Sequence, residues 1–148
     1  MIYLKNIKNK INMIKKKIPA CLIGAGRIGL KLEFDQKRLK PASHFGMFTK
    51  NKSILLKGIC DSNKIEKKYK RKIPKKIKIY KNYNKMIRLE KPRIVSISTW
   101  KDTHYKITND CINFGIKVII LEKPLAKNIA DAKRLIKKIK KKRVKVLV

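Results

Sequence analysis

Short apolar runs alternate with longer amphipathic segments from residue 20 to the end of this 148-residue chain. Six of the runs have the length of buried strands: 20–24, 53–61, 77–82, 93–99, 117–122 and 144–148. The segments between them carry apolar residues at helical spacing. Strands that alternate with helices form a parallel sheet with helices wound on both of its faces. The pattern therefore predicts a doubly wound α/β fold that occupies residues 18–148 as one domain.

The predicted helices show their own start and stop signals. They lie at 27–34, 63–72, 83–91, 104–115 and 128–142. Gly115 is placed to end one helix and Asn128 to cap the next. Lys and Arg crowd the last turn of the final helix, where they oppose the negative end of its dipole. Six parallel strands are the number in a complete dinucleotide-binding (Rossmann) domain, and we expect its strand order, 3-2-1-4-5-6.

The N-terminal segment has a different pattern. Apolar residues stand at 2, 4, 7, 11, 14 and 18 with Lys between them, which predicts a basic amphipathic helix over residues 1–17 that ends at Pro19. A membrane-surface role is the weaker interpretation, because the apolar face has no Trp or Phe. Lys and Asn interrupt the segment too often for a secretory signal. No apolar run approaches the roughly 18 residues of a membrane span, so we expect residence in the cytoplasm.

A glycine-rich stretch, CLIGAGRIG, follows the first predicted strand and opens a helix. It contains Gly24, Gly26 and Gly29 in the spacing G-x-G-x-x-G. In this setting the first glycine allows a tight turn, the second lets a pyrophosphate approach the main chain, and the third allows close helix–strand packing. The amides at the helix start then face the phosphates. We predict that these glycines, with Arg27 and Ile28 between them, bind a nicotinamide dinucleotide.

An acidic residue closes the second predicted strand. Asp61 follows LLKGIC, and a carboxylate at this position accepts hydrogen bonds from the ribose hydroxyls of the cofactor. It would repel a 2′-phosphate, so NAD is favoured over NADP. Lys64, Lys67 and Lys68 follow closely and could offset that repulsion, so NADP is not excluded. The alternative is that Asp61 is only a turn residue before Ser and Asn.

The chain makes an excursion between the glycine motif and Asp61. The third glycine and Asp61 are 32 residues apart, against about 20 in the usual motif. The surplus is segment 33–50, which carries Glu33, Asp35 and His44. This segment leaves the sheet near the expected cofactor crevice. It is a lid, a substrate loop or an ordinary surface excursion, and the sequence does not choose between them.

The fifth predicted strand ends in an unusual way. In VIILEKPLA, residues 118–126, four apolar residues are followed directly by Glu122, Lys123 and Pro124. Two ionised side chains cannot lie inside a sheet without several kcal/mol of compensation. They must emerge at the carboxyl end of the strand, where open α/β sheets bind ligands. The alternative is a surface ion pair in a loop.

Taken together, these segments resemble the Gfo/Idh/MocA family of NAD(P)-dependent oxidoreductases, which act mostly on sugars, cyclitols and related hydroxyl compounds. The resemblance rests on CLIGAGRIG, ICDSN, the run KPRIVSISTWKDTHYKITNDCINFGIKVIILEKPLA and the closing VKVLV, and it covers about residues 18–148. The Glu-Lys-Pro strand end is more specific than the glycines. The resemblance implies a Rossmann cofactor domain, the cofactor NAD or NADP, and a sugar-like substrate.

The resemblance also implies roles for particular residues. Glu122 would lie near the nicotinamide ribose, and Lys123 would reach the hydroxyl or carbonyl of the substrate. Thr99 and Trp100 would line the nicotinamide side, although the family commonly has proline where Trp100 stands. His104 would begin the next helix beside the substrate, as a second catalytic candidate, and simple packing at the helix start is its equal alternative. An ammonium such as that of Lys123 stabilises the negative charge that develops on the reacting oxygen.

Family members continue into a second α/β domain that supplies most substrate contacts, and this chain stops at Val148. We therefore expect a truncated or split form that binds the dinucleotide but turns over poorly alone. A separate polypeptide could complete it, and a homo-oligomer is also possible. The alternative function is that of a nucleotide-binding module that catalyses no reaction.

Charge and cysteines change this picture little. The formal net charge is +33, from 42 Lys and Arg against 9 Asp and Glu, and Lys outnumbers Arg by 35 to 7. Arginine, the residue for forked base and phosphate contacts, is scarce, so we expect nonspecific polyanion binding but no specific nucleic-acid site. A basic nucleic-acid-binding protein is the least favoured reading. Cys21, Cys60 and Cys111 lie in apolar segments as buried small hydrophobes, and with only two histidines we expect no metal site.

Overall fold

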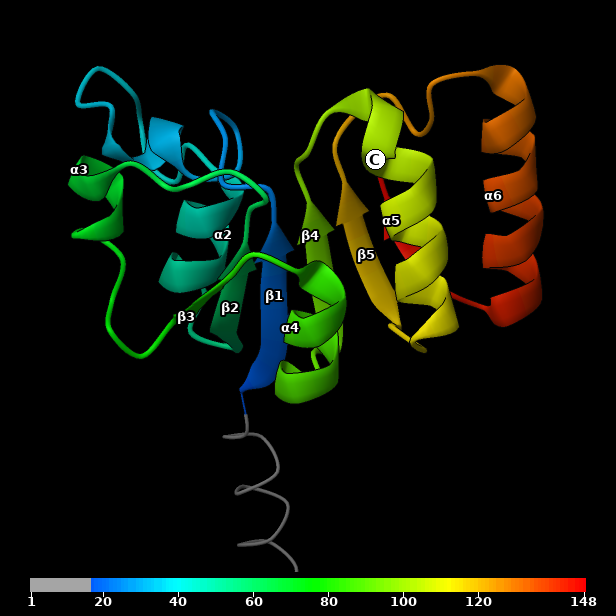
Figure 1. The fold of residues 1–148 in the computed structure, drawn as a ribbon, viewed down its shortest axis with the longest axis horizontal. Coiled ribbons are helices and arrows are strands. Elements are labelled where there is room, and N and C mark those ends of the chain that lie inside the picture. The colour runs from blue at the N-terminus through cyan, green and yellow to red at the C-terminus, as the bar shows by residue number, and fades with distance from the viewer. Residues whose placement is uncertain (1–16) are drawn as a thin grey trace, which may run out of the picture.

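Six parallel strands form the centre of the molecule. The computed structural model describes residues 17–148, so the helix expected over 1–17 lies outside the described residues. The strands are β1 (Ile18–Ile23), β2 (Ile54–Cys60), β3 (Lys78–Tyr80), β4 (Ile94–Ile97), β5 (Val118–Leu121) and β6 (Lys145–Leu147). Every pairing is parallel, and the order is β3-β2-β1-β4-β5-β6 (Figure 1). The predicted doubly wound α/β fold and its strand order are confirmed.

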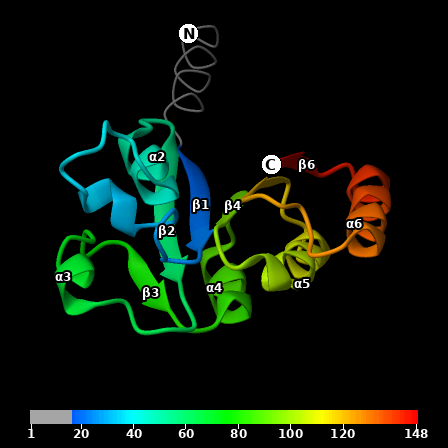
Figure 2. The same ribbon diagram turned by 90° about the horizontal axis from the view of Figure 1, so that it is seen from above.

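Helices cover both faces of this sheet. They are η1 (Lys31–Phe34, a 3-10 helix), α2 (His44–Lys50), α3 (Lys67–Lys70), α4 (Tyr83–Glu90), α5 (Lys101–Asn113) and α6 (Ile129–Lys142). Figure 2 shows α2 on one side of the sheet and α4 and α5 on the other. As predicted, Asn128 caps α6, and its side chain accepts a hydrogen bond from the Asp131 amide at 2.8 Å.

The segment after the glycines does not continue as the predicted helix over 27–34. Residues 27–30 form a turn, and only η1 follows. In a continuous helix the carbonyls of Ile28 and Gly29 would accept from the amides four residues later. They accept instead from the amides of His44 and Phe45, at 3.2 and 2.9 Å. Helix α2 therefore stacks directly on the first turn, although residues 31–43 separate the two in the sequence.

Other boundaries differ by a few residues. Strand β1 begins at Ile18, so Pro19 stands inside the strand, near its start, where the missing N–H is best tolerated. The predicted helix over 63–72 is reduced to the single turn α3, and α5 begins at Lys101. These differences leave the topology unchanged.

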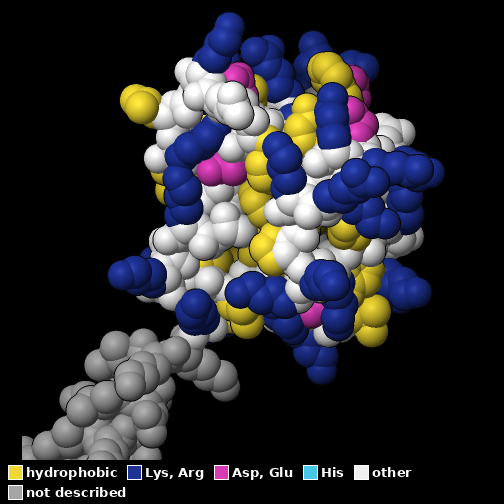
Figure 3. All heavy atoms as spheres, turned by 90° about the vertical axis from the view of Figure 1, so that its left-hand side faces the viewer, with side chains coloured by type: hydrophobic (Ala, Val, Ile, Leu, Met, Phe, Trp, Pro, Cys, Tyr) yellow, Lys and Arg dark blue, Asp and Glu magenta, His cyan; other side chains and the backbone are white. Residues whose placement is uncertain are grey.

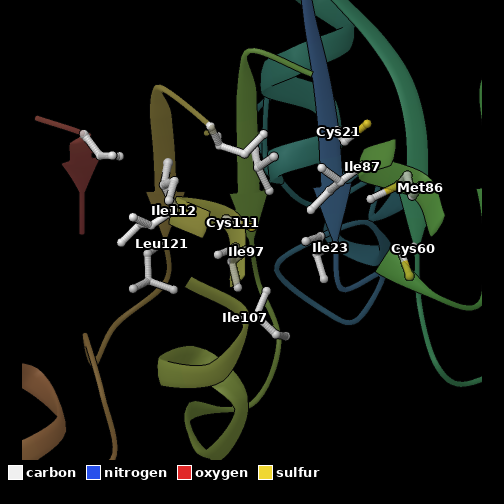
Figure 4. Close-up of a cluster of buried hydrophobic side chains, with 14 residues drawn as sticks. Cys21, Ile23, Cys60, Met86, Ile87, Ile97, Ile107, Cys111, Ile112 and Leu121 are labelled. Carbon is white, nitrogen blue, oxygen red and sulfur yellow. The ribbon is translucent and has the colours of Figure 1, made fainter. Parts of the chain in front are cut away.

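The core consists of two clusters, one on each face of the sheet. Residues of β1 alternate between them: Cys21 and Ile23 pack with α4 and α5, whereas Ala20 and Leu22 pack with α2. Figure 4 shows the first cluster, in which all three cysteines lie. Burial raises the pKa of Cys60 to about 11 and that of the other two thiols to about 12. The thiols therefore stay protonated at neutral pH and act as small apolar side chains, as predicted.

A buried carboxylate ties α4 to the edge of the sheet. Glu90, only 3% exposed, accepts hydrogen bonds from the Tyr80 hydroxyl at 2.5 Å and from Lys78 at 3.0 Å, and its other oxygen lies 2.9 Å from the Lys57 ammonium. Burial by itself would raise the pKa of Glu90. The hydrogen bonds from Tyr80, Lys57 and Lys78 outweigh it and lower the pKa to about 2.

Glu90→Gln is expected to lower the free energy of unfolding by about 2 kcal/mol at pH 7. Because the folded pKa of about 2 lies below the ordinary 4.5, the ionised carboxylate stabilises the fold above pH 4.5. That contribution is lost as the pH falls from 4.5 towards 2. Urea unfolding of both proteins at pH 7, 5 and 3.5 checks this, since the difference must shrink with acid. Glu66→Gln, at an exposed ion pair with Lys31, is the control and should change little.

Basic side chains far outnumber acidic ones, with 42 Lys and Arg against 9 Asp and Glu. All nine acidic residues lie within the described part of the chain, and eight of them have a basic side chain within 4.0 Å. Asp61 is the exception among them. Figure 3 shows Lys and Arg side chains spread over one whole face with few carboxylates between them. Within residues 17–148, no helix combines the length and the apolar character needed to cross a membrane.

Candidate functional site

The predicted site residues meet at one edge of the sheet. The main-chain bonding of the strands continues past their ends, where Ser98 N donates to Ile23 O at 2.8 Å and Glu122 N donates to Ile97 O at 2.9 Å. Because all strands are parallel, the residues that follow them share the carboxyl edge. The glycine loop after β1, Asp61 after β2, Thr99 after β4 and Glu122 after β5 therefore lie along the same edge.

Two of the three glycines are required by close approach of the main chain. Gly24 has φ +97°, and a Cβ atom there would lie 2.6 Å from the Ser98 carbonyl oxygen. At Gly29 a Cβ would lie 2.1 Å from the Gly24 carbonyl oxygen. The Ser98 hydroxyl donates to that same carbonyl at 2.9 Å and so holds the turn. These contacts allow the loop to fold tightly onto the main chain just after the carboxyl end of β4.

Gly26 has a different environment. Apart from its two chain neighbours, no atom of the described residues lies within 4 Å of a Cβ built at this position, so the fold of residues 17–148 does not require glycine there. Within the described residues, the N–H groups of Gly26, Arg27 and Ile28 donate no main-chain hydrogen bond, and the last two residues are exposed. Unpaired amides beside open space at the start of a helical turn suit an anionic group. The loop therefore fits the pyrophosphate of a dinucleotide.

Asp61 is bonded to the same loop. One carboxylate oxygen accepts from the Ala25 amide at 2.8 Å, and the other accepts from the Asn63 amide at 2.8 Å. The side chain is half-buried and, unlike the other carboxylates, lacks a basic partner within the described region. It is thus fixed beside the glycine turn, where a carboxylate accepts from ribose hydroxyls and repels a 2′-phosphate.

Glu122 belongs to a chain of three side chains from three elements. Its Oε1 atom lies 2.8 Å from Nε2 of His44, at the start of α2. The other ring nitrogen of His44, Nδ1, lies 2.7 Å from the hydroxyl of Ser96, which is fully buried in β4. The excursion thus brings a histidine to the Glu-Lys-Pro strand end, 78 residues away in sequence.

Lys123 is exposed at the carboxyl edge, and its bond to Pro124 is cis. His104, 1% exposed, lies behind this turn. Its Nδ1 is 2.7 Å from the Pro124 carbonyl oxygen, and its Nε2 is 3.0 Å from the Thr99 carbonyl oxygen. Each ring nitrogen thus faces a main-chain carbonyl oxygen, and a neutral ring donates to one of the two. His104 lies between the loop after β5 and the loop after β4.

The remaining predicted residues form the rim next to these loops. Thr99 is half-buried, and its hydroxyl accepts from the Thr103 hydroxyl at 2.8 Å. Trp100 precedes α5 and is 84% exposed, so its ring projects from the edge. Asp102 pairs with Lys127 at 2.9 Å, and the hydrogen bond from Lys127 lowers the pKa of Asp102. This ion pair further ties the two loops together.

Three residues of the site were not identified from the sequence. Ser96 and Ser98 were part of a predicted strand, with nothing to indicate that their hydroxyls hold His44 and the glycine turn. His44 was noted within the excursion, but its partner was not foreseen. An isolated Ser or His carries no periodic signal, so only the packed structure reveals such pairs.

Solved structures share this fold. The chain superimposes on the WlbA dehydrogenase from Chromobacterium violaceum in complex with NADH and UDP-GlcNAcA, with a TM-score of 0.70 and 21% identity over 90% of this chain and 35% of that one. A putative oxidoreductase from Magnetospirillum magnetotacticum gives 0.69 and 22% over 88% and 38%. The WlbA dehydrogenase from Bordetella pertussis, also with NADH and UDP-GlcNAcA, gives 0.68 and 20% over 87% and 35%. The chain thus spans about a third of the length of these relatives.

A family model completes the identification. A comparison with curated protein sequences finds no match. The model of the Gfo/Idh/MocA oxidoreductase family, NAD-binding Rossmann fold, matches residues 18–148, which is most of the chain. The resemblance inferred from the sequence is confirmed. The chain belongs to the Gfo/Idh/MocA oxidoreductase family, and residues 18–148 are its NAD-binding domain.

Proposed function

We propose that the chain is the cofactor half of an oxidoreductase that transfers a hydride between the nicotinamide of NAD and a secondary alcohol carbon of a sugar-like substrate. The observation that carries the proposal is that the glycine loop and Lys123 lie along the same edge of one sheet. A dinucleotide bound along that edge has its pyrophosphate at the loop and its nicotinamide towards β5. Lys123 is then within reach of the reacting carbon.

Each residue has a role that its surroundings support. The amides of Gly26, Arg27 and Ile28 bind the pyrophosphate, and Asp61 binds the ribose of the adenosine half. The bound cofactor would accept the hydride in its oxidised form, NAD, and donate it in its reduced form, NADH. The Lys123 ammonium stabilises the negative charge that develops on the substrate oxygen and shares in its proton transfer.

His104 acts through the main chain in this proposal. The sequence suggested it as a second catalytic group, but it is buried, and both of its ring nitrogens lie within 3.0 Å of carbonyl oxygens. We assign it as a positioning residue that fixes the turn at Pro124, and so the direction of the preceding Lys123. Thr99 and Trp100 form the adjoining wall beside the nicotinamide.

A sugar nucleotide is the substrate class that the relatives favour. Two of the structural relatives were solved with UDP-GlcNAcA, and they are about three times as long as this chain. The basic surface of this chain suits an anionic substrate of that kind. A polypeptide equivalent to the rest of those relatives would complete the substrate site, from the same gene or a separate one. Residence in the cytoplasm stays a prediction.

A nucleotide-binding module without chemistry is the second candidate, and it is favoured by the burial of His104, which leaves Lys123 as the one exposed member of the two predicted catalytic residues. An assay of NADH formation from NAD distinguishes the oxidoreductase from the module. The compounds tested are neutral sugars, cyclitols and UDP-sugar acids. Reduction by one of these classes supports the oxidoreductase. NAD binding without reduction by any of them, even with a completing polypeptide added, supports the module.

Asp61→Ser is expected to weaken NADH binding about tenfold and to strengthen NADPH binding. Serine can still accept from the Asn63 amide, but it gives up the charged acceptor for ribose hydroxyls and the repulsion of a 2′-phosphate. Fluorescence titration with each reduced cofactor measures both changes. Asp102→Ser removes an exposed carboxylate from the same edge and should leave both affinities unchanged. An unaltered NADH to NADPH ratio in Asp61→Ser would contradict the assignment.

A further inference from the structure

We propose that the excursion 33–50 is a fixed positioning element, whose function is to hold His44 against Glu122 and thereby aim that carboxylate at the nicotinamide ribose. This inference rests on the proposed function of the edge. This role differs from the three interpretations that the sequence left open, which were a lid, a substrate loop and an ordinary surface excursion. A positioning element neither closes over the site nor touches substrate.

The excursion is anchored by a carboxylate. Glu33, whose side chain is 9% exposed, accepts from the Ala42 amide at 2.9 Å and from the Ser43 hydroxyl at 3.1 Å. Ser43 in turn caps α2 by accepting from the Gly46 amide at 3.0 Å. A Cβ at Gly46 would lie 1.8 Å from the Glu33 carboxylate, so glycine at this position makes room for the anchor.

The two ends of the excursion are fixed as well. The Lys40 ammonium donates to the carbonyls of Leu32 and Asp35, at 3.0 and 2.6 Å, and closes the loop upon itself. On the other side, Phe45 and Phe48 of α2 are 5% and 1% exposed in the core. A segment with a buried anchor, internal bonds and two core aromatics does not behave as a lid. His44 therefore has one defined position.

The contact with Glu122 fixes the role of one ring nitrogen. A carboxylate only accepts, so Nε2 donates to Glu122, while Nδ1 pairs with the Ser96 hydroxyl, which can donate or accept. Ser96 is fully buried and His44 nearly so, whereas the Glu122 side chain is 29% exposed. The hydrogen-bonded series of Ser96, His44 and Glu122 thus leads from the core to the edge of the sheet and ends at the Glu122 carboxylate.

The consequence concerns the orientation of Glu122. His44 engages Oε1, and within the described residues Oε2 has no hydrogen-bond partner and faces no basic side chain. Without His44 the carboxylate would turn freely about its side-chain bonds, and part of its hydrogen bond to a ribose hydroxyl would be lost to that freedom. Only the nicotinamide half of the cofactor would feel the loss.

The test compares two ligands on two variants. ADP occupies the glycine loop and Asp61 but has no nicotinamide ribose, whereas NADH reaches both ends of the edge. His44→Leu removes the donor to Glu122, and His44→Gln retains an N–H donor close to the position of Nε2. We expect NADH to bind His44→Leu about fivefold more weakly, ADP to bind it as it binds the wild type, and His44→Gln to recover most of the NADH affinity. Both affinities are measured by isothermal titration on the full chain.

The outcomes separate this inference from a structural role and from the proposed function. Equal weakening of ADP and NADH in His44→Leu, together with a lowered unfolding midpoint in both variants, would show that His44 only maintains the fold. Unchanged NADH affinity in His44→Leu, with a wild type that binds NADH, would overturn the inference and leave the proposed function standing. A wild-type chain that binds neither ligand would overturn both.

Discussion

Gly26→Val weakens NADH binding at least about 100-fold and leaves the unfolding midpoint of the free chain unchanged. The reason is the open space beside this residue: apart from its two chain neighbours, no atom of the described residues lies within 4 Å of a Cβ there, so the fold does not resist a side chain. That space is where the pyrophosphate approaches the amides, and two added methyl groups fill it. Fluorescence titration with NADH and thermal unfolding without ligand measure the two effects separately.

Gly29→Ala is the matched control, because it adds a smaller side chain to the same loop. Here the Cβ would lie 2.1 Å from the Gly24 carbonyl oxygen, which belongs to the main chain and cannot move aside cheaply. The expected result is a lower unfolding midpoint along with weaker binding. Equal loss of stability in Gly26→Val and Gly29→Ala would contradict the division of roles between the two glycines.

Lys123→Met lowers the rate of hydride transfer about 1,000-fold, with NADH affinity unchanged within about twofold. Methionine keeps most of the length of the lysine side chain but removes the ammonium that stabilises charge on the substrate oxygen. The side chain is exposed at the edge, so its loss leaves no buried group unpaired. Single-turnover reduction of NAD by the substrate found in the panel above, in the completed protein, gives the rate.

Lys127→Met is the control for Lys123→Met, because it removes a second ammonium from the same loop. Lys127 is exposed and pairs with Asp102 at 2.9 Å, so hydride transfer should persist. A rate loss that is equal in the two variants would indicate that general positive charge, and not the position of Lys123, supports the reaction.

Much of the fold could be predicted from the sequence because local patterns determine it. Strands such as Ile94–Ile97 and Val118–Leu121 are mostly apolar runs that are buried or half-buried on both faces, and their alternation with helices fixes the parallel sheet and its order. Glu122 and Lys123 were placed correctly at the carboxyl edge, because ionised side chains cannot remain within a sheet.

The contacts within the site could not be predicted, since they join residues far apart in the chain. The helix expected after the glycines was replaced by η1, because the amides of His44 and Phe45 take the carbonyls that would have extended it. Periodicity carries no information about such an exchange. For the same reason the sequence could not decide whether His104 takes part in catalysis or only packs at the start of the helix. Its contacts with the carbonyl oxygens of Pro124 and Thr99 show which two loops it joins.

The pairing of eight of the nine carboxylates has a consequence for how the molecule meets its ligands. Seven of those eight carboxylates pair with Lys or Arg, which offsets their charges at short range, and the remaining Lys and Arg side chains give the domain a positive potential that reaches about 8–10 Å into physiological buffer. An incoming dinucleotide is drawn towards the protein from every direction, and its encounters become more frequent as salt is diluted. Within the described residues, Asp61 and Glu122 at the carboxyl edge have no Lys or Arg partner, so the last step of docking discriminates between ligands, whereas the long-range attraction does not.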